Sequence, residues 1–112
     1  MLLNHLGISV DEVEPADTFL RKHFSLAPMG RRTSKMAGLR DEHGFALVLM
    51  QGPPADPRRL HIGFHQDSDD AVNEIHARLV ADGIDAPAPR RMHGAWAFYF
   101  SAPGGIYIEV SH

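Results

Sequence analysis

The feature that most constrains the fold of this chain is a near-repeat within its own sequence. The letters His-Leu-Gly-Ile at positions 5–8 begin the first half, and His-Ile-Gly-Phe at positions 61–64 begin the second. In each half there follow an acidic loop, an amphipathic helical pattern, a turn that ends in Gly, and a further apolar strand pattern. Because self-similarity at a fixed offset is the signature of a repeated structural unit, the sequence predicts two copies of one supersecondary unit.

The repeat extends to the apolar positions of two predicted helices. These positions correspond in three pairs at the same offset: Ala16 with Val72, Phe19 with Ile75, and Phe24 with Val80. Helical spacing predicts a first helix at about 15–24 and a second helix whose apolar stripe ends before Gly83. Apolar runs between turn residues predict the strands, at 2–10, 31–34, 37–40, 45–51, 60–65 and 106–110.

The length of the chain indicates that the two halves fold together. At 112 residues the chain fits one domain, whereas each half alone would have a marginal core. The segment 52–57 contains three prolines and a glycine and cannot continue a regular element, so we predict a hinge there. The expected organisation is a single domain with modules at about 1–52 and 58–112.

Composition excludes several classes of function. The net charge of −3 gives no basic surface for nucleic acid, and the longest apolar run, at 45–50, is far too short to span a bilayer. The first residues show no signal-peptide pattern, so we expect a cytoplasmic protein that binds neither nucleic acid nor membrane. Because the chain has no Cys, any metal must be held by nitrogen and oxygen ligands.

Two histidines and one carboxylate form a candidate metal site. His5 and His61 occupy the same position in the two repeats, and Glu109 interrupts the apolar strand predicted at 106–110. This ligand set recurs in divalent-metal sites that keep coordination positions open. The alternatives are histidines that only form structural hydrogen bonds and an edge carboxylate that faces solvent. The equivalent placement of the histidines, and the cost of burying an unpaired carboxylate, favour the metal-ligand interpretation.

Strand alternation predicts which other side chains share a face with these ligands. His65 lies on the face of His61, Ser9 on the face of His5, and Tyr107 on the face of Glu109. A neutral His in that place can act as a general base near neutral pH or orient a ligand. We therefore predict a catalytic role for His65 and substrate contacts for Ser9 and Tyr107.

Taken together, these residues resemble the vicinal oxygen chelate superfamily, which includes glyoxalases, bleomycin-resistance proteins and extradiol dioxygenases. The similarity is carried by the paired His-x-Gly strands, the helices after them, and the run Phe-Tyr-Phe-Ser-Ala-Pro-Gly-Gly at 98–105 that leads to Glu109. It spans essentially the whole chain. It implies an α+β fold in which two βαβββ modules form a curved mixed sheet around a metal and ligand cavity.

The resemblance also implies where metal ligands lie, on the first and last strand of each module. When Gly44 is matched to Gly104, the four positions are His5, Leu49, His61 and Glu109. Leu49 cannot bind a metal, so the chain departs from the four-ligand pattern of glyoxalase I and supplies three ligands. Such a site suits Fe(II), with Mn(II) or Zn(II) as alternatives, and a substrate that binds through adjacent oxygens.

Within the superfamily, the segment 93–109 is most similar to the signature of extradiol ring-cleavage dioxygenases. This similarity implies that Tyr99 positions the substrate and that His65 or His93 moves protons. Trp96 either lines the mouth of the cavity, where it would bind substrate, or covers the core. Those enzymes have an additional acid–base histidine upstream of the second ligand; here only His43 is near, in a predicted turn, and its role is left open.

Two other functions stay open. A fosfomycin-type thiol transferase uses the same three ligands, although that family resembles a longer chain with cationic residues after the final strand. A bleomycin-resistance-like binding protein would sequester a small molecule without metal, although such proteins generally lack a complete ligand set. Small members of the superfamily usually pair, so we expect a homodimer, and His5 joins the other two ligands either within one chain or across two.

Overall fold

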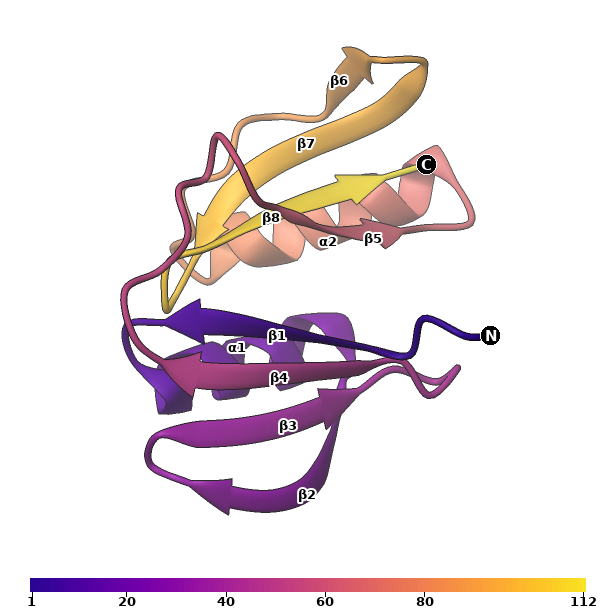
Figure 1. Cartoon of the computed structure of the whole chain (residues 1–112). Coiled ribbons are helices and arrows are strands. Elements are labelled where there is room, and N and C mark those ends of the chain that lie inside the picture. The colour runs from indigo at the N-terminus through magenta and orange to yellow at the C-terminus, as the bar shows by residue number, and fades with distance from the viewer. The chain divides into compact units, whose positions relative to one another are not determined.

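The chain folds into two modules of identical element order, each βαβββ (Figure 1). The structure, a computed structural model, describes residues 1–112. The first module comprises β1 (His5–Val10), α1 (Val13–Phe24), β2 (Ala27–Thr33), β3 (Met36–Arg40) and β4 (Ala46–Gln51). The second comprises β5 (Ile62–His65), α2 (Asp69–Ala81), β6 (Arg90–Met92), β7 (Ala95–Ala102) and β8 (Ile106–Ser111). The predicted α+β class with two βαβββ modules is therefore confirmed.

The chain forms two compact units. Unit 1 consists of Met1–Asp56 together with Pro103–Ile106, and unit 2 consists of Pro57–Ala102 together with Tyr107–His112. Each unit has one four-stranded sheet and one helix. Neither helix combines the length and the apolar composition that a bilayer span demands.

In unit 1 the strand order is β1-β4-β3-β2, with β1 parallel to β4 and the other pairs antiparallel. Alternation gives the sheet an apolar face, which carries fully buried Val10, Leu39 and Leu49. Helix α1 supplies the rest of this core through Leu20 and other apolar residues. The helix begins two residues before Pro15, since Pro is tolerated in the first turn of a helix.

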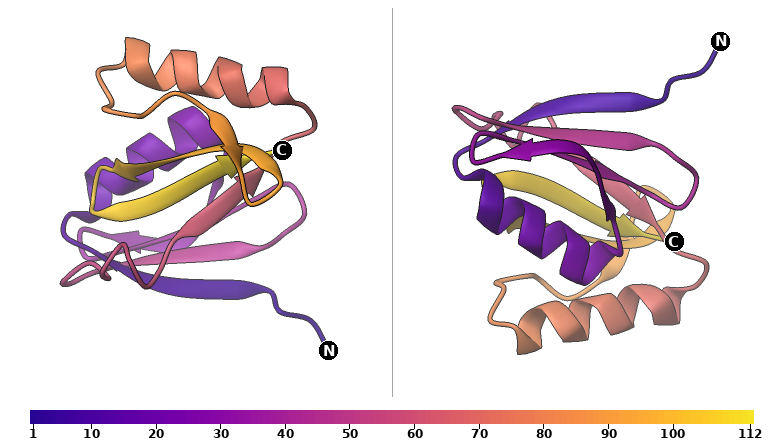
Figure 2. Two further views of the ribbon diagram at one scale, coloured as in Figure 1. Left: turned by 90° about the horizontal axis from the view of Figure 1, so that it is seen from above. Right: turned by 90° about the horizontal axis from the view of Figure 1, so that it is seen from below.

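Unit 2 repeats this plan with the strand order β5-β8-β7-β6, and β5 is parallel to β8. Figure 2 shows α2 running along one face of this sheet. Val72 and Leu79 of α2 and Phe98 and Ile108 of the sheet are all fully buried. Burying one such aliphatic side chain contributes about 1.5–3 kcal/mol. This face holds the unit together and leaves the opposite face available for a site.

Several element boundaries differ from the sequence prediction. The first strand begins at His5, not at position 2, and β5 begins at Ile62, so His61 precedes it. Strand β2 is longer than predicted, and β6 was not predicted as a strand. Both are exposed along much of their length and carry charged residues, so they lack the alternating apolar pattern that identifies a strand in sequence.

The turn before β8 packs tightly within unit 1. Gly104 has a φ of 90°, and its carbonyl accepts a hydrogen bond from the amide of Asp11 at 3.1 Å. A Cβ added to Gly104 would lie 2.8 Å from Cβ of Ala16. Only glycine satisfies both the backbone conformation and the available space.

We therefore expect Gly104→Ala to destabilise unit 1. The left-handed backbone costs an alanine about 1–2 kcal/mol, and the clash with Ala16 adds about 1–3 kcal/mol. Gly44→Ala is the matched control, because Gly44 has a φ of 87° but nothing within 4 Å of an added Cβ. Denaturant unfolding should show the larger loss for Gly104→Ala. Equal losses would contradict the packing argument.

Candidate functional site

The centre of the candidate site is a contact between His61 and Glu109 in unit 2. His61 Nε2 lies 3.2 Å from Glu109 Oε2, and the two side chains are 46% and 22% exposed. His61 directly precedes β5, and Glu109 lies in β8, which pairs with β5 in parallel. The structure thus brings together two of the three predicted metal ligands.

Strand alternation explains why Glu109 is accessible within an apolar strand. Its neighbours Ile108 and Val110 are fully buried on the helix-covered face, so Glu109 lies on the opposite face. Gly63 is its partner across the parallel ladder, and nothing lies within 4 Å of a Cβ placed there. The residue opposite Glu109 on β5 thus has no side chain, and the space above it is unfilled.

Two tyrosines adjoin the pair. The ring of Tyr99 meets His61 edge-on at 5.4 Å and stacks on Tyr107 at 5.6 Å between centroids. Burial, a hydrogen bond to Glu109 and the charge of Glu109 raise the pKa of the Tyr99 hydroxyl. Tyr99 is therefore protonated at neutral pH and donates to the Glu109 carboxylate. The predicted residues Tyr99 and Tyr107 both belong to this cluster.

The two predicted proton carriers, His65 and His93, lie elsewhere in unit 2. His65 shares the open face of β5 but is four residues from His61, about 13 Å along an extended strand. Its ring lies 6.0 Å from that of His112. His93 has a φ of 51° and lies in the exposed turn between β6 and β7. The structure does not bring His65 or His93 next to the His61–Glu109 pair.

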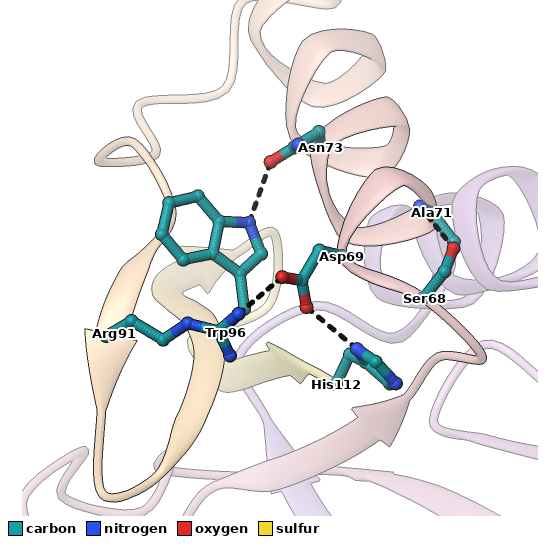
Figure 3. A network of polar contacts seen from close by, with 7 residues as sticks. All are labelled: Ser68, Asp69, Ala71, Asn73, Arg91, Trp96 and His112. Atoms are coloured by element: carbon teal, nitrogen blue, oxygen red, sulfur yellow. Dashed lines mark hydrogen bonds and ion pairs between the residues drawn. The ribbon is translucent and has the colours of Figure 1, made fainter.

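Trp96 lies on the face of the unit 2 sheet that α2 covers. Its Nε1 donates to Oδ1 of Asn73 on α2 at 2.8 Å (Figure 3). Trp96 and Tyr99 are three residues apart in one strand, so alternation directs them to opposite faces. The structure therefore places Trp96 against α2, on the face opposite Tyr99.

Sequence reasoning missed a polar network at the start of α2. Arg91 Nη2 donates to Asp69 Oδ2 at 2.6 Å, and His112 Nδ1 lies 2.7 Å from Asp69 Oδ1 (Figure 3). The guanidinium of Arg91 also lies 5.5 Å from the ring centroid of Trp96. No local sequence pattern reveals these contacts of Asp69, because its partners are 22 and 43 residues away.

In unit 1, His5 begins β1 on the open face of the sheet. Its Nδ1 lies 2.8 Å from Oδ1 of Asn4, and the residue is exposed. Ser9 shares this face and is paired with Met50. His43 lies in the exposed turn after β3, where its amide donates to Asp41 Oδ1 at 2.9 Å.

The position in unit 1 that corresponds to Glu109 is Val48, which corrects the assignment of Leu49. Glu109 pairs with Gly63 in unit 2, and the equivalent Gly7 pairs with Val48 in unit 1. Leu49 points to the helix-covered face, where it is fully buried. Valine offers no donor atom either, so the conclusion that this fourth position supplies no ligand is unchanged.

The sequence alignment was wrong by one residue because the second module carries two adjacent turn glycines. Gly104 and Gly105 both have positive φ, of 90° and 80°. The strand registers match Gly44 to Gly105, whereas the sequence alone favoured Gly104.

The donor set of unit 2 fits a divalent metal. Two neighbouring ligands at right angles on one metal, with bonds of about 2.1 Å, lie about 3 Å apart. The 3.2 Å between His61 Nε2 and Glu109 Oε2 is close to this separation. Within unit 2, no third His, Asp or Glu joins the pair as a ligand. Unit 2 by itself therefore offers one imidazole and one carboxylate.

The Tyr99–Glu109 hydrogen bond is open to a direct titration. The chain has two tyrosines, so in a Tyr107→Phe background the ultraviolet absorbance of tyrosinate reports Tyr99 alone. Adding Glu109→Gln should lower the pKa of Tyr99, because the negative charge that opposes deprotonation is removed. Glu74→Gln, on the exposed side of α2, is the control and should leave the titration unchanged. An unchanged pKa in Glu109→Gln would contradict the contact.

The network of Figure 3 should contribute to the stability of unit 2. Asp69 and Asp70 both lie in the first turn of α2 and share its favourable dipole, but only Asp69 contacts Arg91 and His112. We expect Asp69→Ala to cost about 1 kcal/mol more than Asp70→Ala in denaturant unfolding, since exposed pairs contribute about 0.2–1 kcal/mol each. Equal costs would show that the helix dipole accounts for the whole effect.

Comparisons with known proteins agree with this architecture. Residues 2–110 match the model of the Glyoxalase/Bleomycin resistance protein/Dioxygenase superfamily. A solved structure of a possible glyoxalase from Bacillus cereus is 41% identical, with a TM-score of 0.91, and the match covers 100% of this chain and 99% of that one. No curated protein matches the chain significantly.

More distant structures share the fold. A lactoylglutathione lyase from Agrobacterium tumefaciens is 18% identical with a TM-score of 0.78, covering 98% of this chain and 92% of that one. The fosfomycin resistance protein FosX from Listeria monocytogenes is 19% identical with a TM-score of 0.82, covering 99% and 92%. With a family match over nearly its whole length and a relative 41% identical, this chain belongs to the glyoxalase/bleomycin resistance protein/dioxygenase superfamily.

Proposed function

We propose that the protein is a divalent-metal-dependent enzyme that acts on a small substrate through two adjacent oxygen atoms. The observation that carries this proposal is the His61–Glu109 contact, in which an imidazole nitrogen and a carboxylate oxygen lie 3.2 Å apart on an accessible face. In the proposal His5 is the third ligand, because it holds the place of His61 in the first repeat. Fe(II) is the expected metal, with Mn(II) or Zn(II) as alternatives.

The residues around the pair have separate tasks in this proposal. A bound divalent metal would act as a Lewis acid and would keep coordination positions for substrate oxygens. His61 and Glu109 hold the metal, and the Tyr99 hydroxyl fixes the orientation of the Glu109 carboxylate by donating to it. Tyr107, stacked on Tyr99, limits the rotation of that ring and offers an aromatic surface to a substrate. His65 lies at the other end of β5, so its proposed proton transfer would require a substrate that reaches it.

Ring cleavage of a catechol is the specific reaction that we propose to test first. Its support is the similarity of segment 98–109 to the extradiol signature and the contact of Tyr99 with the candidate ligand Glu109. The lyase and the fosfomycin resistance protein named above share the fold at under 25% identity, so they do not decide the reaction. We further propose a homodimer, and the partner chain is one possible source of His5.

Metal affinity tests the ligand set. Removing an outer-shell partner of a metal ligand typically costs 10–100-fold in affinity, so His61→Ala and Glu109→Gln should each lose at least about tenfold for Zn(II) or Mn(II). His5→Ala should do the same. His43→Ala is the matched control, because its side chain is 85% exposed in a turn, and it should bind as the unaltered protein does. Calorimetric titration gives the constants, and equal affinity in all variants would overturn the site.

A substrate panel tests the reaction. The protein is loaded with Fe(II) without oxygen, mixed with catechols, and then exposed to air. Yellow ring-cleavage products would support the dioxygenase proposal, whereas loss of glutathione in the presence of an epoxide would identify a thiol transferase. Tight binding of small molecules, with neither reaction and no metal, would instead establish a non-catalytic binding protein.

A further inference from the structure

The open face of the unit 1 sheet has a regular chemical layout, of which the metal proposal uses only His5. The strand registers arrange its residues in three rows across β1, β4, β3 and β2. The first row is His5, Ala46, Arg40 and Ala27; the second is Gly7, Val48, Gly38 and Met29; the third is Ser9, Met50, Met36 and Thr33. None of these positions carries a carboxylate, and one carries a permanent positive charge.

Three methionines give this face an accessible apolar surface. Met29, Met36 and Met50 are 36%, 45% and 37% exposed, although methionine is usually found in cores. Flexible thioether side chains adapt to irregular ligands and make favourable contacts with aromatic rings. Exposed methionines gathered on one face are therefore suited to binding an apolar group.

Two glycines lie beneath these methionines. A Cβ on Gly7 would lie 3.1 Å from Cε of Met50, and a Cβ on Gly38 would lie 3.0 Å from Cγ of Met29. The absence of side chains at these two positions lets the methionines lie flat against the sheet. Gly7 and Gly38 are the two partners of Val48 across the sheet, and Val48 holds the place that Glu109 has in unit 2.

Arg40, the charged residue among these positions, lies in the same row as His5. Arg40 is exposed, and its partners across the sheet are Ala46 on β4 and Ala27 on β2. Ala46 is in turn the partner of His5. Arg40 and the candidate metal ligand His5 thus lie on either side of Ala46, with Met29 one row away and Met36 and Met50 two rows away. A guanidinium binds a carboxylate or phosphonate through paired hydrogen bonds.

We infer that the open face of unit 1 binds the organic body of an anionic substrate, with Arg40 holding its acidic group and Met29 and Met50 contacting its apolar part. This inference rests on the proposed function in one respect: the substrate's adjacent oxygens are taken to lie next to His5. It narrows the substrate class to small aromatic or alkyl acids. Neutral diols and strongly cationic molecules are disfavoured, because they leave the arginine unpaired.

Methionine-methyl NMR tests this inference with an internal control. The chain has five methionines, of which Met1 and Met92 lie outside this face. In the metal-free protein, 3,4-dihydroxybenzoate should shift the methyl signals of Met29, Met36 and Met50 in a saturable manner and leave those of Met1 and Met92 in place. Catechol, which lacks the carboxylate, should bind at least about fivefold more weakly, as expected for the loss of a charged hydrogen bond.

Arg40→Gln should remove that preference by weakening 3,4-dihydroxybenzoate about fivefold or more while leaving catechol unchanged. Arg90→Gln, an exposed arginine on β6 of unit 2, is the matched control and should change neither. Shifts confined to Met92, or an equal loss in both variants, would overturn the inference.

If the methyl signals respond as expected but added Zn(II) binds nowhere, the inference stands and the proposed metal function fails. If Zn(II) binds and these methyl signals do not respond, the reverse holds.

Discussion

Parallel pairing of the first and last strand of each module is the constraint on which the rest of the structure depends. It places β5 beside β8 and β1 beside β4, so that residues about 45 apart in the chain become neighbours in one ladder. In unit 2 this pairing brings His61 within 3.2 Å of Glu109. The buried face of the same strands fixes the register, because a slip by one residue would turn Glu109 into the core.

The two modules share one fold but carry different side chains on their open faces. In unit 2 the open face carries an imidazole, a carboxylate and two tyrosines, and its central position is Glu109. In unit 1 the corresponding position is Val48, and the surrounding residues are glycines and methionines. Among the positions paired across the unit 1 sheet, the polar residues on this face are His5, Ser9, Thr33 and Arg40. This difference supports the proposal that one module binds a metal and the other binds the organic part of a substrate.

Much of the fold could be predicted because the repeat, the helical spacing and the apolar strands are local patterns in sequence. The His61–Glu109 contact was also foreseeable, since equivalent strand starts and an acidic residue in an apolar strand both stand out. The match of Leu49 to Glu109 failed because two adjacent glycines gave two possible alignments, and only the strand register chooses between them. The placement of Trp96 and the Asp69 network depended on contacts between distant segments, which no local pattern contains.

The central proposal is that His5, His61 and Glu109 bind one metal ion, and X-ray absorption spectroscopy of the zinc-loaded protein tests it most directly. Imidazole rings give a distinct multiple-scattering signal, so the histidine ligands of the metal can be counted. The account predicts two imidazoles with oxygen completing the shell, and one imidazole after His5→Ala. A single imidazole in the unaltered protein, or a spectrum that His5→Ala leaves unchanged, would contradict it.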